Sequence, residues 1–198
     1  MNSMEINELV GTTTIDLDER LALIPKHIET QEELNEWEQA NILTAKLWLS
    51  KHKLALTDFA TIEFCKLLHK KMFNKTWKWA GQFRKTNKNI GIDWFRISIS
   101  LKDLFADVLS QIQHDSYPIV EIAARFHHRL VYVHPFSNGN GRHARLATDC
   151  LMLILKQNLF NWGARELTTP NEIRKIYIKA LQKADLGDYQ ELIRFIKS

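Results

Sequence analysis

Apolar residues recur every three or four positions along most of this chain, which is the spacing that places them on one face of an α-helix. Two of the helical segments begin with the Ser/Thr-x-x-Glu capping box that marks a helix start, at Thr30–Glu33 and Thr169–Glu172. Pro170 stands at the first helical position after the second box. The predicted helices cover about 20 residues from residue 30 onward, then residues 58–72, 101–113, 118–133, 142–154, 170–186 and 189–196.

Residues 83–99 depart from helical spacing. Two stretches, Phe83–Asn87 and Phe95–Ile99, flank a polar turn at Lys88–Gly91, and the second alternates apolar and polar residues. This arrangement predicts a β-hairpin. A lone hairpin has an unpaired edge that can accept an extended segment of another protein, although a hairpin that only caps the core fits these residues as well.

The elements predict an all-α fold with one β-hairpin, in which about seven helices surround a central helix-turn-helix unit. The chain has 198 residues, of which 45% are hydrophobic, and this is enough for one sizeable core. Residues 1–29 are weakly periodic and contain Gly11 and Pro25 as breakers. We therefore expect an irregular N-terminal arm over residues 1–29 and a single domain over residues 30–198.

Charge and cysteine content narrow the class of protein. The net charge is +4 and no run of five or more Lys or Arg occurs, so we expect neither a direct nucleic-acid partner nor a membrane. Cys65 and Cys150 lie in apolar helical stretches and indicate buried reduced thiols. The N-terminus does not have the pattern of a secretory leader, and the longest apolar run, residues 150–155, is far shorter than a membrane span. These features predict a cytoplasmic protein.

The residues that carry chemistry are concentrated in residues 134–145, His-Pro-Phe-Ser-Asn-Gly-Asn-Gly-Arg-His-Ala-Arg. Asn138–Gly141 can turn sharply because Gly, and less easily Asn, accepts positive φ, and the N–H groups of such a turn form a nest for an anion in front of the next helix. Arg142 and Arg145 are three residues apart, on one helix face, and suit bidentate contacts with phosphate. His134 can act as a general base at the rim of this pocket. Any two of these features would fit an ordinary helix connection with surface arginines, but all of them in this order favour a phosphate-handling site.

The same stretch resembles the signature of the Fic/Doc family, His-x-Phe-x-(Asp/Glu/Asn)-Gly-Asn-Gly-Arg-x-x-Arg, and meets it at every fixed position. Residues 79–84, 126–131 and 184–189 are also similar to family segments, so the resemblance covers nearly the whole chain. Residues 34–42, Leu-Asn-Glu-Trp-Glu-Gln-Ala-Asn-Ile, further resemble the subgroup called mobile mystery protein B.

The resemblance implies the Fic fold and the activity of a protein adenylyltransferase, which transfers AMP from ATP to a Ser, Thr or Tyr hydroxyl of a target protein and releases pyrophosphate. It implies that His134 is the catalytic base and that ATP is used with Mg²⁺ or Mn²⁺. Phe136 would anchor the turn in the core, and Arg145 would reach the γ-phosphate. The implied phosphate-binding residues are Asn138, Gly139, Asn140, Gly141, Arg142 and Arg145.

The predicted hairpin would, by the same resemblance, be the flap that aligns the target segment over the active site. Its target-binding residues would be Lys85, Thr86, Asn87 and Ile97. The target protein is thus the expected partner, docked on this flap.

Two positions depart from the pattern of many family members. Asn138 stands where many active members have Asp or Glu as a Mg²⁺ ligand, so its neutral carbonyl oxygen predicts weak metal binding. The resemblance also implies a regulatory glutamate, on a helix near the site, that pairs with the motif's second arginine, here Arg145. Glu36 and Glu38 lie on the first predicted helix without the full inhibitory pattern, and Glu38 is the better candidate; if it inhibits, Glu38→Gly should raise activity.

Other functions remain open alongside AMP transfer. The same pocket could transfer a different phosphate-containing group or remove AMP. A non-catalytic reading is a nucleotide-gated module of a toxin-antitoxin-like pair, in which a small regulatory partner supplies the inhibitory glutamate.

Overall fold

The computed structural model describes residues 21–28, 30–164 and 169–198, so most of the predicted arm lies outside the described residues. The described part is built from α-helices and contains no strand, which confirms the all-α class. The helices are α2 (Gln31–Ser50), α3 (Leu56–Phe59), α4 (Ile62–Phe73), α5 (Ile97–Gln113), α6 (Ile119–Val133), α7 (Asn140–Ile154), α8 (Pro170–Asp185) and α9 (Gln190–Lys197), with a 3₁₀ turn, η1 (Trp94–Arg96), before α5.

Both predicted capping boxes are confirmed. The Thr30 hydroxyl accepts the Glu33 N–H, and the Glu33 carboxylate accepts the Thr30 N–H in return. Thr169 and Glu172 do the same at the start of α8. Because each box fixes where its helix begins, α2 and α8 start where the sequence predicts.

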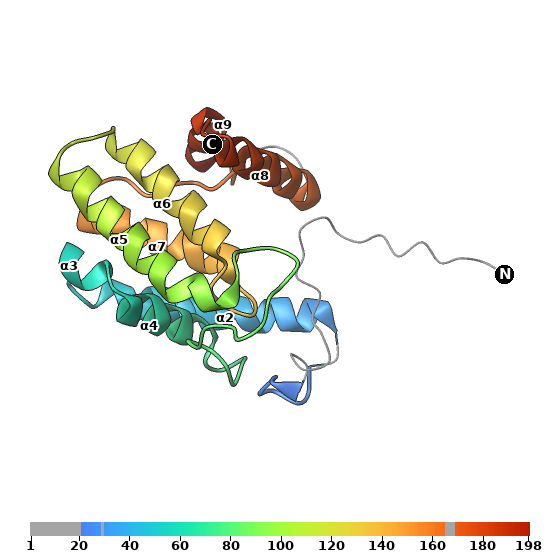
Figure 1. Cartoon of the computed structure of the whole chain (residues 1–198). Coiled ribbons are helices and arrows are strands. Elements are labelled where there is room, and N and C mark those ends of the chain that lie inside the picture. The colour runs from blue at the N-terminus through green and yellow to red at the C-terminus, as the bar shows by residue number, and fades with distance from the viewer. Residues whose placement is uncertain (1–20, 29, 165–168) are drawn as a thin grey trace.

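The helices form a main bundle with a smaller pair at one end. In Figure 1, α5, α6 and α7 cross the centre, α2 and α4 pack together below them, and α8 and α9 sit at the opposite end against α6. The main core is made of apolar side chains from α2 to α7. A second cluster, which includes Tyr177, Leu192 and Phe195, fastens α8 and α9 to α6.

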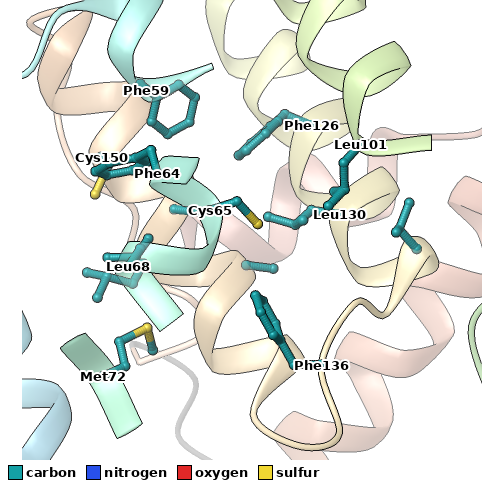
Figure 2. Packing of buried hydrophobic residues seen from close by; sticks show 14 of the residues in the cluster. Phe59, Phe64, Cys65, Leu68, Met72, Leu101, Phe126, Leu130, Phe136 and Cys150 are labelled. Atoms are coloured by element: carbon teal, nitrogen blue, oxygen red, sulfur yellow. The ribbon is translucent and has the colours of Figure 1, made fainter. Parts of the chain in front are cut away.

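The loop between α6 and α7 is anchored in the main core by Phe136. This ring is fully buried and points from the loop toward the side chains of α4 and α6, as Figure 2 shows. Its packing confirms the predicted anchor role, because the buried ring holds the loop against the bundle. Cys65 and Cys150 are buried free thiols, as expected.

The prediction of a β-hairpin over residues 83–99 is wrong. Ile97 and Ile99 belong to α5, because the apolar positions continue as Leu101 and Leu104 at helical spacing and bury that face. Residues 84–93 form an irregular loop that doubles back on itself, and we call it the flap loop.

Side chains replace the cross-strand backbone bonds that a hairpin would use. The guanidinium of Arg84 donates to the carbonyls of Thr86 and Ile92, on opposite arms of the flap loop. The Asn87 side chain accepts the Trp94 N–H and donates to Asp93. Because these carbonyl and N–H groups are already hydrogen-bonded, they do not form a β-ladder between the two arms.

The described end of the arm lies against the turn after α4. Leu23 and Trp77 form an isolated antiparallel bridge, and the Ile24 N–H donates to the Thr76 carbonyl. Over the described ranges, no helix is long and apolar enough to cross a bilayer.

Candidate functional site

Residues 134–139 connect α6 to α7 through two left-handed residues. His134 ends α6 at φ 51°, and Gly139 precedes α7 at φ 76°. Glycine is required at 139 for space as well as for φ, because a Cβ there would lie 2.6 Å from the Phe73 ring. The left-handed His134 is strained, so its conformation needs support from neighbouring residues.

That support comes from side chains that bind the loop's carbonyl groups. Arg84 donates through Nε to the His134 carbonyl at 2.8 Å and through its backbone N–H to the Pro135 carbonyl at 3.0 Å. His69 Nε2 donates to the Asn138 carbonyl at 3.1 Å, while its Nδ1 accepts the Gly81 N–H. The loop's carbonyls thus face the scaffold.

The opposite side of the loop is the N-terminus of α7. The first N–H groups of a helix have no carbonyl partner within it, and the helix dipole makes this end attractive to anions. A Cβ added at Gly141 would meet no atom within 4 Å, so space is open beside the first turn of α7. The Asn140, Gly141 and Arg142 amides lie at this open helix end, whereas the Gly139 N–H, also predicted for the anion nest, donates to the Asn138 side chain.

His134 sits on this loop with its ring buried. Its Nε2 is buried without a hydrogen-bond partner. Burial, together with the positive charge of Arg84, lowers the pKa of His134 to about 4, against the opposing effect of a hydrogen bond with the Val131 carbonyl. Since Nε2 is unpartnered, we assign the ring N–H to Nδ1, which leaves the Nε2 lone pair free to accept a proton.

Arg142 is held on the α2 side of the site. Its Nη1 lies 2.5 Å from Glu38 Oε2, and the Trp77 indole N–H donates to the other Glu38 oxygen at 2.7 Å. The guanidinium also lies over the Phe73 ring. Glu38 is thus next to the first arginine of the motif, whereas the exposed Glu36 has no contact with either arginine.

Arg145 lies on the other side of α7, among aromatic rings. Its guanidinium carbon is 4.8 Å from the centre of the Tyr177 ring and 5.8 Å from that of Trp162, and its Nε is buried without a partner. The positive charge of Arg145 contributes, after burial, to lowering the pKa of His127 to about 3. The two motif arginines therefore diverge, and only Arg142 lies at the first turn of α7.

Two asparagines of the motif use their side chains within the loop. Asn140 accepts the Phe136 N–H and donates to the Phe136 carbonyl, so both ends of its amide are occupied. Asn138 Oδ1 accepts the Gly139 N–H at 2.6 Å. In this arrangement the Asn140 side chain braces the turn and is not directed at a phosphate.

The residues present do not fit a resident metal ion. Asn138 offers one neutral oxygen that already accepts a hydrogen bond, whereas Mg²⁺ favours carboxylate oxygens beside nucleotide phosphates. Within the described ranges, no three His, Cys, Asp or Glu side chains come together as a metal-binding group.

The predicted target-binding residues of the flap separate into two groups. Lys85, Thr86 and Asn87 are exposed on the flap loop. Ile97 is buried in α5 and is not accessible to a target. A groove of about 350 Å³ runs beside the flap loop, and it is lined by Lys66, Gly81, Gln82, Phe83, Arg84, Lys85, Trp94, Phe95 and Ser98.

Sequence reasoning missed the residues that hold the motif loop in place, His69 and Arg84. Each residue was included in a predicted segment, but neither was assigned a role at the site. Arg84 lies in the 79–84 segment that resembles the family, and this was its only signal. His69 gave none, because its role depends on contacts with a residue 69 positions away.

Residues 59–152 match the sequence model described as the Fic/DOC family. The chain is 32% identical over 121 residues, 59% of its length, to protein adenylyltransferase fic-1 of Caenorhabditis elegans, and these cover 22% of that protein. It is 26% identical over 185 residues, 91% of its length, to protein adenylyltransferase Fic of Aedes aegypti, where they cover 34%. The chain thus spans about a fifth to a third of the length of these relatives.

The fold is also similar to solved structures. The BepC effector protein of Bartonella tribocorum, solved with bound AMPPNP, superposes with a TM-score of 0.68 at 21% identity, over 95% of this chain and 92% of that one. Residues 134–508 of C. elegans Fic-1 superpose with a TM-score of 0.60 at 26% identity, over 79% of this chain and 45% of that one.

Proposed function

We propose that this chain, whose residues 59–152 match the Fic/DOC family model, is a protein adenylyltransferase that transfers AMP from ATP to a Ser, Thr or Tyr hydroxyl of a target protein. The observation that carries the proposal is the pairing, on one loop, of an unpartnered imidazole nitrogen with an open helix N-terminus. His134 Nε2 makes no hydrogen bond, and the space beside Gly141 is empty of protein atoms. A base and an anion site are the two parts that transfer of a phosphate-linked group requires.

The reaction follows from these parts. The phosphates of ATP bind at the first turn of α7, where the Asn140, Gly141 and Arg142 amides and the Arg142 guanidinium offset their charge. The target hydroxyl oxygen attacks the α-phosphorus and forms a new P–O bond, while the bond to the β-phosphate breaks and pyrophosphate leaves. His134 Nε2 takes the hydroxyl proton, because the ring is neutral at pH 7.

Arg145 and the metal ion act on the nucleotide in this proposal and take no part in proton transfer. For Arg145 to reach the γ-phosphate, as the family resemblance implies, its side chain must turn away from Tyr177 and Trp162. Mg²⁺ or Mn²⁺ would neutralise charge on the nucleotide and enter with it, since the chain's own residues do not form a metal site.

The target docks at the flap loop in this proposal. The groove beside the loop carries the cations of Lys66 and Lys85 and the exposed rings of Trp94 and Phe95, a mixture of charge and aromatic surface suited to a protein segment. Residues 64–92 contain eight Lys or Arg and no Asp or Glu, so a target segment with acidic residues fits best.

Glu38 is proposed to inhibit the enzyme. It occupies Arg142, a residue that the phosphates need, and must release it before ATP can bind productively. A small regulatory partner that strengthens or breaks this pair would control activity. A cytoplasmic location and membership of the mobile mystery protein B subgroup are part of the same proposal and rest on sequence alone.

The test is incubation of the full chain with α-labelled ATP, Mg²⁺ or Mn²⁺ and a lysate of its host, beside the His134→Ala variant. Label on protein bands that is lost with His134→Ala, together with ATP binding that is retained, is the expected result. Label from another nucleotide, or loss of AMP from an adenylylated protein, would replace AMP transfer by a related reaction. ATP binding without turnover in both proteins would support a nucleotide-gated module.

A further inference from the structure

The flap loop closes directly over the proposed base. A Cβ placed on Gly91 would lie 2.5 Å from the Cβ and 3.3 Å from the Cγ of His134. The flap-loop backbone therefore lies directly against the His134 side chain, and only glycine fits at position 91. His134 is only 6% exposed, and its Nε2 is buried. A target hydroxyl must come within about 3 Å of Nε2 to give up its proton. The flap loop must therefore move for the proposed reaction to occur.

One side chain connects the flap loop to the base. Arg84 is 3% exposed, and its guanidinium donates to three carbonyls, those of Thr86 and Ile92 in the flap loop and that of His134. A planar guanidinium presents its N–H groups in a fixed fork, so these three bonds set the position of both arms of the loop relative to the His134 backbone.

The bonds from Arg84 also support a strained residue. His134 has φ 51°, and Arg84 donates to the carbonyls of His134 and of the following Pro135. Asp93, at the end of the flap loop, lies close enough to favour the Arg84 charge, although burial is the larger influence and lowers its pKa. The cation is thus committed to this loop and is not available to a ligand.

We propose that Arg84 is a positioning residue for the AMP transfer: it holds His134 in its left-handed conformation and keeps the flap loop closed over the imidazole until a target displaces it. The inference rests on the proposed function. It assigns Arg84 no contact with ATP or with the target hydroxyl.

The closed loop has a chemical consequence for the base. Burial is the main cause that lowers the pKa of His134, with the charges of Arg84 and Lys88 adding to it and the Val131 carbonyl opposing it. When the loop opens, water or the target hydroxyl reaches Nε2, and the pKa rises toward 6.5. The base becomes stronger when a target arrives, and a closed enzyme has little proton-accepting power toward water.

The experiment compares Arg84→Lys with Arg96→Lys in the full chain. Lysine keeps the charge at position 84 but cannot bind three carbonyls at once. Arg96 is exposed in η1, directly after the flap loop, and provides the same substitution without those bonds. The imidazole signals are followed by NMR as the pH changes, and His134 is assigned with His134→Ala.

The pKa of His134 is expected to rise by about one unit or more in Arg84→Lys and to stay unchanged in Arg96→Lys. The kcat of AMP transfer should fall about tenfold in Arg84→Lys with the KM for ATP within about twofold, since the phosphate site is untouched. A general loss of stability would not shift one histidine's titration.

Gly91→Ala provides a second route to the same result if Arg84→Lys does not fold. The added methyl group would lie 2.5 Å from the His134 Cβ and 3.1 Å from an Arg84 nitrogen, so it pushes the flap loop off both side chains, and the His134 pKa should again rise. If the His134 pKa is the same as in the wild type in each of Arg84→Lys and Gly91→Ala that folds, the proposal is wrong. If the wild-type chain shows no His134-dependent AMP transfer, the proposed function fails, whereas the titration still decides whether Arg84 holds the loop closed.

Discussion

Glu38 on α2 and Arg142 on α7 form a 2.5 Å ion pair across 104 positions of sequence. The Glu38 carboxylate is buried, and Trp77 donates to its second oxygen, so the carboxylate is fixed in place before any ligand arrives. Arg142 is partly exposed and lies at the helix end where an anion would bind. A phosphate bound there, as proposed, would therefore compete with Glu38 for the same guanidinium.

Replacing Glu38 by Gln is expected to raise both ATP affinity and the rate of AMP transfer, each by about tenfold, a gain of about 1.4 kcal/mol. The amide removes the charge that competes with phosphate but keeps an oxygen for the Trp77 N–H. Titration calorimetry with ATP and transfer from α-labelled ATP measure the two effects.

Glu36→Gln is the matched control for this prediction, since Glu36 is exposed on the same helix. It should leave both values unchanged. Glu38→Gly should also activate, but it leaves the Trp77 N–H without its acceptor and costs about 1 kcal/mol of helix stability as well. Equal activities for wild type and Glu38→Gln would show that this ion pair is only structural.

Gly141 offers a test of the phosphate site that separates binding from folding. Its Cβ position is free of protein atoms, and alanine favours a helix over glycine by about 1 kcal/mol, so Gly141→Ala should be as stable as the wild type or more stable. The methyl group would occupy the space proposed for phosphate and weaken ATP binding by about tenfold. Urea unfolding and calorimetry on one preparation give both numbers.

Gly139→Ala is the contrasting change two residues away. Its methyl group would meet the Phe73 ring, and its φ of 76° disfavours alanine, so a loss of about 1 to 3 kcal/mol of stability is expected. If Gly141→Ala binds ATP normally, the first turn of α7 is not where the phosphates lie.

The sequence predicted the parts of the site that are local and missed the parts that are distant. Glycine at 139, the start of α7 and the place of His134 before the turn follow from residues within one turn of each other, and the capping boxes are equally local. Arg84 and His69 reach the motif loop from 50 and 69 positions away, and such contacts leave no pattern in the residues between.

The wrong hairpin has a similar cause. The alternation of residues 95–99 favoured a strand. Burial of Ile97 together with Leu101 and Leu104 instead stabilises a helix over a much longer segment. Tertiary packing therefore overrode a short local pattern. Arg84, and not a strand ladder, connects the two arms of the flap loop.

His69 is expected to stabilise the site through its two ring nitrogens. His69→Phe keeps the stacking on Phe136, whose centroid is 3.7 Å away, but leaves the Gly81 N–H and the Asn138 carbonyl without partners. A loss of about 2 to 4 kcal/mol follows from two unsatisfied buried groups. Urea unfolding measures it, with exposed His52→Phe as the control that should stay within about 0.5 kcal/mol.

Four buried histidines should make the fold sensitive to acid. Burial is the main cause that lowers the pKa of His127 to about 3, those of His134 and His143 to about 4, and that of His69 well below its usual value. Between about pH 4 and 6, and most fully near pH 5, the unfolded chain therefore binds up to four more protons at these rings. Burial of Asp149 acts in the opposite sense, because it raises that pKa to about 6 and lets the folded state bind one more proton.

The net difference is three protons in favour of the unfolded chain, so stability falls as the pH drops through this range, by up to about 4 kcal/mol per pH unit from these groups. Urea unfolding at steps between pH 7 and pH 4.5 measures the slope. His143→Gln removes one of the buried titrating rings and should reduce the slope by about a quarter to a third, whereas His52→Gln, on the surface, should leave it unchanged. A stability that stays constant from pH 7 to pH 5 would mean that these imidazoles are solvated in the folded protein. The inferred closure of the flap loop over His134 would then be wrong as well.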